Sequence, residues 1–141
     1  MSIVEQTLLA ATDRLSLKKI NLVRNFPNGP MHIQADADKL SLALLNIVIN
    51  AIEAMEEDSG ELSIILEEQA FQHLLVIQDN GCGINGEGLS RLFEPYFTSK
   101  RNGMGLGLAA TLNIVQVHKG TIDVRSEEKK GTIFSLFFPK L

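Results

Sequence analysis

Residues 79–84 read DNGCGI and place an acidic residue, an amide, two glycines and the single cysteine of the chain within six positions. Clusters of Asp, Asn and Gly are among the commonest turn signals, so these residues by themselves predict a tight turn and nothing more. The preceding HLLVIQ (73–78) predicts that the turn follows a strand. What stands elsewhere along the chain, and in what order, decides which fold this turn belongs to.

The composition indicates one folded domain without a nucleic-acid-binding surface. The chain has 141 residues, of which 45% are hydrophobic and 21% charged, which suits a core-forming domain and not a disordered chain. Its net charge of −4 gives no support to nucleic-acid binding, which usually shows as a clustered basic surface. A single cysteine excludes an internal disulfide and fits a reducing compartment.

No segment predicts membrane insertion or export. The sequence has no run of about 18 apolar residues, the length that a membrane helix needs. Its start, MSIVEQTLLA (1–10), carries Glu5 and no basic flank, unlike a signal peptide. We therefore expect a cytoplasmic chain that makes no membrane contact itself, although it could be the cytosolic part of a larger membrane protein.

The hydrophobic pattern predicts helices and antiparallel hairpins in one domain. Helices are expected at 3–18, 38–57, 86–92 and 105–118, the second of them capped by Asp36 or Asp38. Strands are expected within 19–26, at 33–35, and in two hairpins, 61–68 with 73–78 and 121–126 with 132–139. This pattern predicts an α+β, two-layer sandwich, in which a mixed, mostly antiparallel sheet of about five strands carries about three main helices on one face.

The predicted helix at 38–57 carries two asparagines, Asn46 and Asn50, opposite its apolar stripe. Asparagine is a poor residue for a helix interior because its side chain competes for backbone hydrogen bonds. A solvated polar face would account for the pair, but Leu42 and Ile49 share that face, which favours the wall of a cleft. Amide oxygens suit Mg²⁺ that also holds substrate phosphates. On this helix alone both interpretations stay open.

Three glycines, Gly103, Gly105 and Gly107, precede or open the predicted helix at 105–118. The N–H groups at a helix start form an anion site, and glycine lets a phosphate approach closely. A flexible loop with helix-packing glycines would have the same spacing. The following segments form no parallel βαβ unit with an acid at its second strand, and the chain has no Gly-Lys-Ser/Thr, so neither a dinucleotide fingerprint nor a P-loop fits.

Taken in order, these stretches resemble the ATP-binding catalytic domain of two-component sensor histidine kinases, within the gyrase–chaperone–histidine kinase ATPase superfamily. LLNIVINAIEAM (44–55) resembles the N box, DNGCGI the first glycine box, RLFEPYFTSK (91–100) the F box, NGMGLGLAA (102–110) the second glycine box and GTIFSLFFP (131–139) the closing Gly-Thr strand. The ordered set covers nearly the whole chain and is specific. It implies a Bergerat-type ATP-binding fold with the short lid of nitrogen-regulation-type kinases.

The resemblance implies a role for each motif in binding ATP. Asp79 would accept a hydrogen bond from the adenine amino group, Gly81 and Gly83 would let the chain turn under the base, and Ile84 would pack on it. An adenine selector needs such an acceptor in apolar surroundings. For Phe93, core packing explains the residue equally well. The implied ATP-contacting residues are Asn46, Asn50, Asp79, Gly81, Gly83, Ile84, Phe93, Ser99, Lys100, Gly103, Gly105, Leu106, Gly107, Leu108 and Thr132.

The resemblance also implies Mg²⁺ as a cofactor, with Asn50 as its ligand between the phosphates. Asn46 stands where the ATPase branches carry a catalytic Glu, and an amide cannot act as that base. This favours phosphoryl transfer to a protein over hydrolysis. Many family members have a basic residue where this chain has Glu53, so another residue must neutralise the phosphate charge. Lys100 is our first candidate for this role and Arg101 our second. We expect Asn46 and Lys100 to be catalytic, although Lys100 could also be a solvated lysine.

A histidine kinase needs an acceptor histidine on a dimerising helix, and His32, His73 and His118 lack the sequence context of one. We read all three as structural. We therefore expect residues 1–141 to be a single catalytic domain without the dimerisation and phosphoacceptor domain. Alone, it should be monomeric and bind ATP without phosphorylating itself. Its expected partners are a His-bearing dimerisation domain of the same full-length protein and a response regulator.

Two other functions fit parts of the pattern. A serine kinase of the anti-sigma type would share the fold, but that branch usually has Glu at the position of Asn46. A nucleotide-sensing or scaffolding domain without catalysis would be expected to have lost some of the motifs, whereas all of them look intact here.

Overall fold

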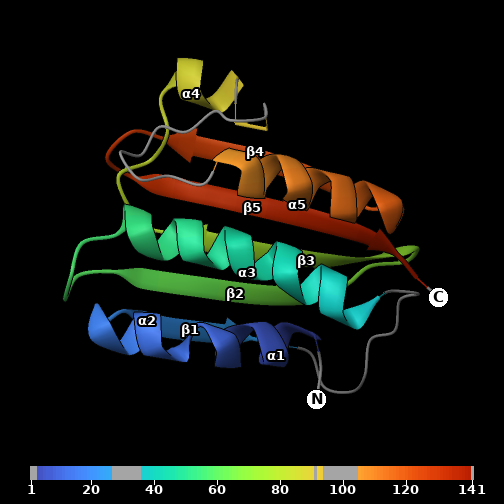
Figure 1. The fold of residues 1–141 in the computed structure, drawn as a ribbon, viewed down its shortest axis with the longest axis horizontal. Helices are drawn as coiled ribbons and strands as arrows, with labels where there is room; N and C mark the ends of the chain where they lie inside the picture. The colour runs from blue at the N-terminus through green and yellow to red at the C-terminus, as the bar shows by residue number, and fades with distance from the viewer. Residues whose placement is uncertain (1–2, 27–35, 91, 94–104, 141) are drawn as a thin grey trace.

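The computed structural model describes residues 3–26, 36–90, 92–93 and 105–140, and they form one layer of helices on one sheet. The helices are α1 (Ile3–Ala10), α2 (Thr12–Leu17), α3 (Ala37–Ala54), α4 (Gly86–Ser90) and α5 (Gly105–Val117). The strands are β1 (Asn21–Asn25), β2 (Glu61–Glu68), β3 (Gln72–Asp79), β4 (Thr121–Glu127) and β5 (Gly131–Pro139). Figure 1 shows α1, α3 and α5 lying along one face of the sheet.

The five strands are ordered β1-β2-β3-β5-β4. β1 runs parallel to β2, and the other neighbours are antiparallel. Alternate residues of β5 are buried under the helices, while those between them are only half-buried on the other face. The α+β fold with a mixed, mostly antiparallel sheet and helices on one face is therefore confirmed.

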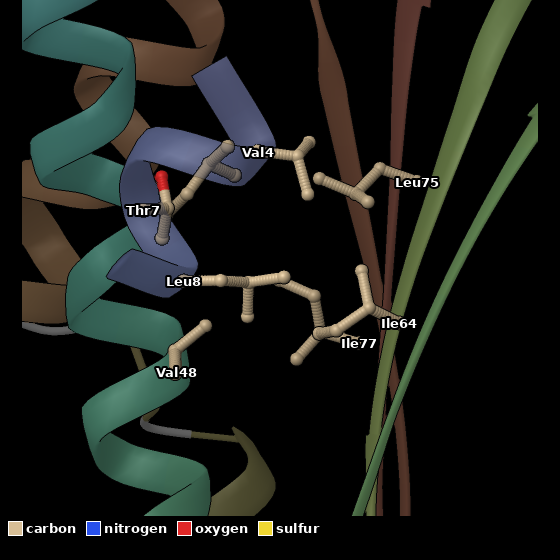
Figure 2. A pocket seen from close by; sticks show the side chains of 8 residues that line it. Val4, Thr7, Leu8, Val48, Ile64, Leu75 and Ile77 are labelled. Carbon is tan, nitrogen blue, oxygen red and sulfur yellow. The ribbon is translucent and has the colours of Figure 1, made fainter. Parts of the chain in front are cut away.

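α3 supplies much of the core. Its apolar stripe, predicted from the helical spacing, is buried at Leu40, Leu44, Ile47, Val48, Ala51 and Ile52. Figure 2 shows where α1 and α3 meet β2 and β3, with Val4, Leu8 and Val48 turned toward Ile64, Leu75 and Ile77. The cavity between them measures about 10 Å³. This is at the lower limit for one water molecule, so it is a packing gap and not a ligand site.

The boundaries of α3 depend on contacts from other parts of the chain. Asp36 is the N-cap, since its carboxylate accepts a hydrogen bond from the Lys39 amide at 3.2 Å. The helix ends at Ala54, before the predicted residue 57. There Lys18 donates to the carbonyl oxygens of Ile52 at 3.0 Å and of the C-cap residue Met55 at 2.8 Å, while the Met55 amide also donates to Ile52 at 3.2 Å.

The single helix predicted at 3–18 is two helices that break at Ala11. The Ala11 amide is shared between the carbonyl oxygens of Thr7 (3.2 Å) and Leu8 (3.1 Å). The hydroxyl of Thr12 also donates to Leu8, at 3.1 Å. Threonine hydroxyls that bond the preceding turn bend helices, which accounts for the break. The strand predicted at 33–35 lies outside the described residues.

Candidate functional site

The DNGCGI turn begins at Asp79, the last residue of β3, and this residue is only 6% exposed. Its carboxylate accepts a hydrogen bond from the Gly81 amide at 2.8 Å. This short side-chain bond to the backbone two residues on is the usual way in which Asp starts a turn. The carboxylate thus lies where a strand of the core gives way to a turn.

The two glycines of the turn are required by close backbone approaches. A Cβ at Gly81 would collide with the carbonyl of Ala54 at the end of α3. Gly83 has a φ of +74°, and a Cβ there would collide with the carbonyl of Glu127 at the end of β4. The Cys82 amide also donates to Ala54, at 3.0 Å. The turn is therefore held between α3 and the β4–β5 hairpin.

Asn80 ties the same turn to the start of β2. Its side-chain oxygen accepts from the Glu61 amide at 2.8 Å, and its side-chain nitrogen donates to the Ser59 carbonyl at 3.1 Å. In the sequence Asn80 was only part of a turn signal, because its partners lie about 20 residues upstream. Asp79 is therefore held in place by the bonds of Asn80 to the start of β2 and by the contacts of the turn with α3 and the β4–β5 hairpin.

Thr132 lies directly beside Asp79. The two residues are register partners across β3 and β5, and Ser126 of β4 is the register partner of Thr132 on the other side. Thr132 is 4% exposed, and its hydroxyl lies 2.8 Å from that of Ser126. Asp79, Thr132 and Ser126 thus form one polar row across three strands, on the sheet face that the helices cover.

Sequence reasoning identified Asp79 and Thr132 but missed Ser126. A signal was present, because Ile122, Val124 and Ser126 alternate on one face of β4 and Ser126 is the only polar member. A polar residue that interrupts an apolar strand face needs a hydrogen-bonding partner. The identity of that partner depends on strand register, which the sequence does not display.

A hollow of about 300 Å³ adjoins this end of the sheet. Asp79, Ser126 and Thr132 line it together with Gln78, Arg125, Glu127, Lys130, Gly131 and Ile133. The charged side chains at its rim form ion pairs, Arg125 with Asp123 at 3.3 Å and Lys130 with Glu127 at 3.2 Å. Gln78, Arg125 and Ile133 alternate with Asp79, Ser126 and Thr132 along their strands and face the uncovered side of the sheet. The hollow therefore opens on that side and is not space between the helices and the polar row.

Asn46 and Asn50 lie half-buried on α3, one helical turn apart. The next turn of the same helix ends at Ala54, which contacts Cys82 of the DNGCGI turn. The two asparagines are thus neither in the core nor on a fully solvated face, and Asn50 is the nearer of the two to the turn.

α5 runs antiparallel to α3. The Asp36 amide donates to His118 Nε2 at 2.9 Å, and Thr111 donates to the carbonyl of Ala43 at 3.4 Å. Because both helices rise 1.5 Å per residue, this alignment sets the first turn of α5, which begins at Gly105, beside the part of α3 that holds the two asparagines. Figure 1 shows the start of α5 over the later half of α3.

The remaining predicted site residues divide into two groups. Ile84 and Phe93 are half-buried against the core, and Leu108 is a buried core residue, so a ligand would meet Leu108 through its backbone. Ser99, Lys100, Arg101 and Gly103 lie outside the described residues. Gly105, Leu106 and Gly107 form the first turn of α5.

Two of the three histidines fall within the described residues. The Asp36 amide donates to Nε2 of His118, so Nδ1 is the ring nitrogen that donates to the Ile114 carbonyl, at 2.8 Å. The His73 side chain is buried on β3, whereas His118 is half-buried and both of its ring nitrogens are hydrogen-bonded.

Residues 35–141 match the family of histidine kinase-, DNA gyrase B- and HSP90-like ATPases. Since this match spans well over half of the sequence, the chain belongs to that ATPase family. It is homologous to the catalytic domains of sensor histidine kinases, as its motifs indicated.

The chain is 37% identical over 138 residues to the sensor histidine kinase ZraS of Escherichia coli O157:H7, covering 98% of this chain and 30% of that protein. It is 34% identical over 139 residues to the histidine-protein kinase AtoS of Escherichia coli K12, covering 98% and 23%. The chain therefore spans less than a third of these relatives.

Among solved structures, the nucleotide-free catalytic domain of histidine kinase ThkA matches with a TM-score of 0.87 and 27% identity, covering 98% of this chain and 90% of that one. Histidine kinase ThkA in complex with response regulator protein TrrA matches with a TM-score of 0.83 and 24% identity, covering 99% and 40%. No helix within the described residues is both long and apolar enough to span a membrane.

Proposed function

We propose that this chain is the Mg-ATP-binding catalytic domain of a sensor histidine kinase and transfers the γ-phosphoryl group of ATP to a histidine on a separate dimerisation domain. The observation that carries the proposal is the meeting of three motifs at one end of the fold. The DNGCGI turn begins at the buried Asp79, whose register partner across the sheet is Thr132. The same turn contacts Ala54 at the end of α3, the helix that carries Asn46 and Asn50.

At the adenine end, Asp79 would accept a hydrogen bond from the exocyclic amino group. A carboxylate has about four acceptor positions, so it can bond the Gly81 amide and a base together. Ile84 would cover the base with apolar surface. A hydrogen bond to a charged acceptor that is nearly buried discriminates strongly between ligands.

At the phosphate end, the first turn of α5 lies beside the part of α3 that holds Asn46 and Asn50, and its backbone N–H groups point along the helix axis beyond the start of α5. Such a helix start favours anions. Ser99, Lys100, Gly103, Gly105, Leu106 and Gly107 are the proposed phosphate contacts here, and Lys100 or Arg101 would supply positive charge. Glu53, which is exposed on α3, cannot supply that charge.

The protein oxygen atoms proposed to lie around the phosphates would suit Mg²⁺ as ligands. The ion usually takes one or two protein oxygens and completes its shell with phosphate oxygens and water. The half-buried amide of Asn50 is such a donor, and the described residues contain no group of three or more His, Cys, Asp or Glu side chains that could hold a metal. When bound, Mg²⁺ would neutralise charge that develops on the phosphates.

In the transfer step, an imidazole nitrogen from the dimerisation domain forms a bond to the γ-phosphorus as the bond to the β–γ bridging oxygen breaks and ADP leaves. This chain's residues act by position and charge. Asn46 would orient the phosphates and not take a proton, because an amide is no base at neutral pH. His118 cannot be the acceptor, since both of its ring nitrogens are bonded.

The wider assignment follows from the same proposal. The chain would be one catalytic domain, monomeric alone and cytoplasmic, and it would work with its dimerisation domain and a response regulator. That a response regulator is named in the structure of ThkA with TrrA supports this partner class.

Calorimetry of a non-hydrolysable ATP analogue tests the proposal directly. Binding to the wild type should be micromolar to submillimolar and Mg²⁺-dependent. Asn50→Asp should change the Mg²⁺ dependence, whereas Asn113→Asp on the exposed side of α5 should not. No binding at millimolar analogue would contradict the proposal.

A second experiment tests the reaction. The chain is mixed with ATP and the His-bearing helices of its cognate kinase, and the phosphorylated product is treated with acid. An acid-labile phosphohistidine is expected. A product that is only acid-stable phosphoserine would instead support the anti-sigma-type kinase, and binding without any transfer would support a nucleotide-sensing domain.

A further inference from the structure

Ser126 lies within hydrogen-bonding distance of three groups at this end of the sheet. Its hydroxyl oxygen lies 2.8 Å from the Ile84 amide, 3.0 Å from the Gly131 carbonyl and 2.8 Å from the Thr132 hydroxyl. These partners belong to the DNGCGI turn, to the β4–β5 turn and to the strand residue beside Asp79. One hydroxyl group therefore joins the three backbone segments that surround the proposed adenine site.

The direction of each hydrogen bond follows from counting protons. A serine hydroxyl has one proton to donate and two lone pairs to accept. The Ile84 amide can only donate, and the Gly131 carbonyl can only accept. If Ser126 donates to Gly131, its remaining lone pair must accept the proton of Thr132, and all three short contacts are then hydrogen bonds. The opposite direction would leave two acceptor oxygens 3.0 Å apart with no proton between them.

This arrangement determines whether the Thr132 hydroxyl offers a proton or lone pairs to the space beside Asp79. Because the hydroxyl proton of Thr132 points at Ser126, only lone pairs of that oxygen remain for the space beside Asp79. Directly opposed residues in an antiparallel pair have Cβ atoms about 4.5–5.5 Å apart, so two acceptors stand close together there. A purine with an amino group at position 6 offers two N–H donors to such a pair, whereas a 6-oxo purine offers an acceptor oxygen at that position and only its ring N1–H as a neighbouring donor.

We propose that Ser126 is a positioning residue that sets the selectivity of this site for 6-amino over 6-oxo purine nucleotides, by holding Thr132 as a hydrogen-bond acceptor beside Asp79. Ser126 does not touch the base itself. The inference rests on the proposed function, since it assumes that a nucleotide base sits at Asp79 and Thr132.

The test compares ADP with IDP, whose bases differ in their 6-substituent. Dissociation constants are measured by calorimetry for the wild type, Ser126→Ala, Ser126→Thr and the control Ser135→Ala, which changes a serine on the uncovered face of β5. The wild type should prefer ADP by tenfold or more. Ser126→Ala frees the Thr132 hydroxyl to donate, so ADP binding should weaken about tenfold, roughly the effect of one ordinary hydrogen bond, while IDP binding changes less.

Two variants separate positioning from a merely structural role. Ser126→Thr keeps the hydroxyl and should keep the wild-type ADP/IDP ratio, as should Ser135→Ala. In a Thr132→Val background, where the hydroxyl to be oriented is missing, Ser126→Ala should no longer change the ratio. If Ser126→Ala does not fold, Ser126→Cys takes its place in the same comparison, since the thiol is a weak donor.

An unchanged ratio in Ser126→Ala, or equal weakening of both nucleotides, would overturn the role of Ser126 and leave the proposed function standing. Failure of the wild type to bind either nucleotide would overturn the proposed function itself. A ratio that falls in Ser126→Ala and is restored by Ser126→Thr supports the inference. Faster amide hydrogen exchange at Ile84 in Ser126→Ala would support the lost bond to that amide.

Discussion

Two neighbouring rows of side chains on the same sheet face are equally buried at their centres but differ in chemistry. Across β3, β5 and β4, one row consists of Ile77, Phe134 and Val124, and the next consists of Asp79, Thr132 and Ser126. Both lie under the helices, and the strand members at their centres are equally buried. The first row is core, whereas the second is a polar site.

The comparison teaches how a site can be built at the edge of a core. A buried polar group is costly unless it is hydrogen-bonded, and the polar row meets this condition with its own backbone neighbours. Asp79 bonds Gly81, and Ser126 bonds Ile84 and Gly131. The apolar row next to it needs only good packing, so changes in the two rows should affect different properties.

The largest effect is expected in the apolar row. Phe134→Ala removes a large side chain that is 4% exposed, and the cavity left behind should lower the free energy of unfolding by about 3–5 kcal/mol. Urea denaturation followed by circular dichroism measures this. A loss of less than about 1 kcal/mol in unfolding free energy would mean that packing in this row contributes little to stability.

In the polar row the same kind of change should affect binding instead. Asp79→Asn keeps an oxygen that can accept from Gly81, so the turn should survive, but it places an amide where the base requires a charged acceptor. We expect about 100-fold weaker ATP binding and little loss of stability. Calorimetry and thermal unfolding of the same samples measure both, and Asp123→Asn on exposed β4 is the matched control. Equal ATP affinity in the two variants would contradict the role of Asp79.

Gly83→Ala tests the turn that joins the polar row to α3. A residue with φ near +74° is strained when it carries a Cβ, and here the Cβ would also meet the Glu127 carbonyl. We expect a loss of about 1–3 kcal/mol in unfolding free energy, together with weaker ATP binding. Gly86→Ala is the control, since a Cβ there meets nothing within 4 Å. A variant as stable as that control would show that the turn can relax.

The smallest effect is expected at the end of the sheet opposite Asp79, where Glu68 and Lys140 form an ion pair at the surface. A hydrogen bond from Lys140 at 2.8 Å, with the lysine charge, lowers the pKa of Glu68. A lowered folded-state pKa means that the pair stabilises the fold above the unfolded pKa of about 4.3 and that this contribution is lost as the pH falls through the folded value. Such surface pairs contribute little.

The comparison for this pair is between the wild type and Glu68→Gln. Their urea midpoints should differ slightly at pH 7 and converge as the pH falls below 4, while ATP affinity stays the same in both. A gap between the midpoints that widens with acid would contradict the sign derived from the pKa.

Local patterns predicted much of this fold, and non-local contacts account for what they missed. The spacing of Leu40, Leu44, Ile47 and Val48 predicted the buried face of α3, because helical periodicity is a property of neighbouring residues. The end of that helix at Ala54 was not predicted, since Lys18 satisfies its last carbonyl groups from 34 and 37 positions away. The choice of Asp36 over Asp38 as the cap was likewise decided in three dimensions.

The sequence by itself determined the types of the main elements, the order of the motifs and the family to which the chain belongs. Only the tertiary structure decided which polar groups meet. Asp79, Ser126 and Thr132 become neighbours through the register of β3, β5 and β4. Register is set by the packing of the whole face, because a slip of one residue would turn every side chain of a strand to the other side. That is why the hydrogen-bonding partners of Ser126 could be recognised only in the folded chain.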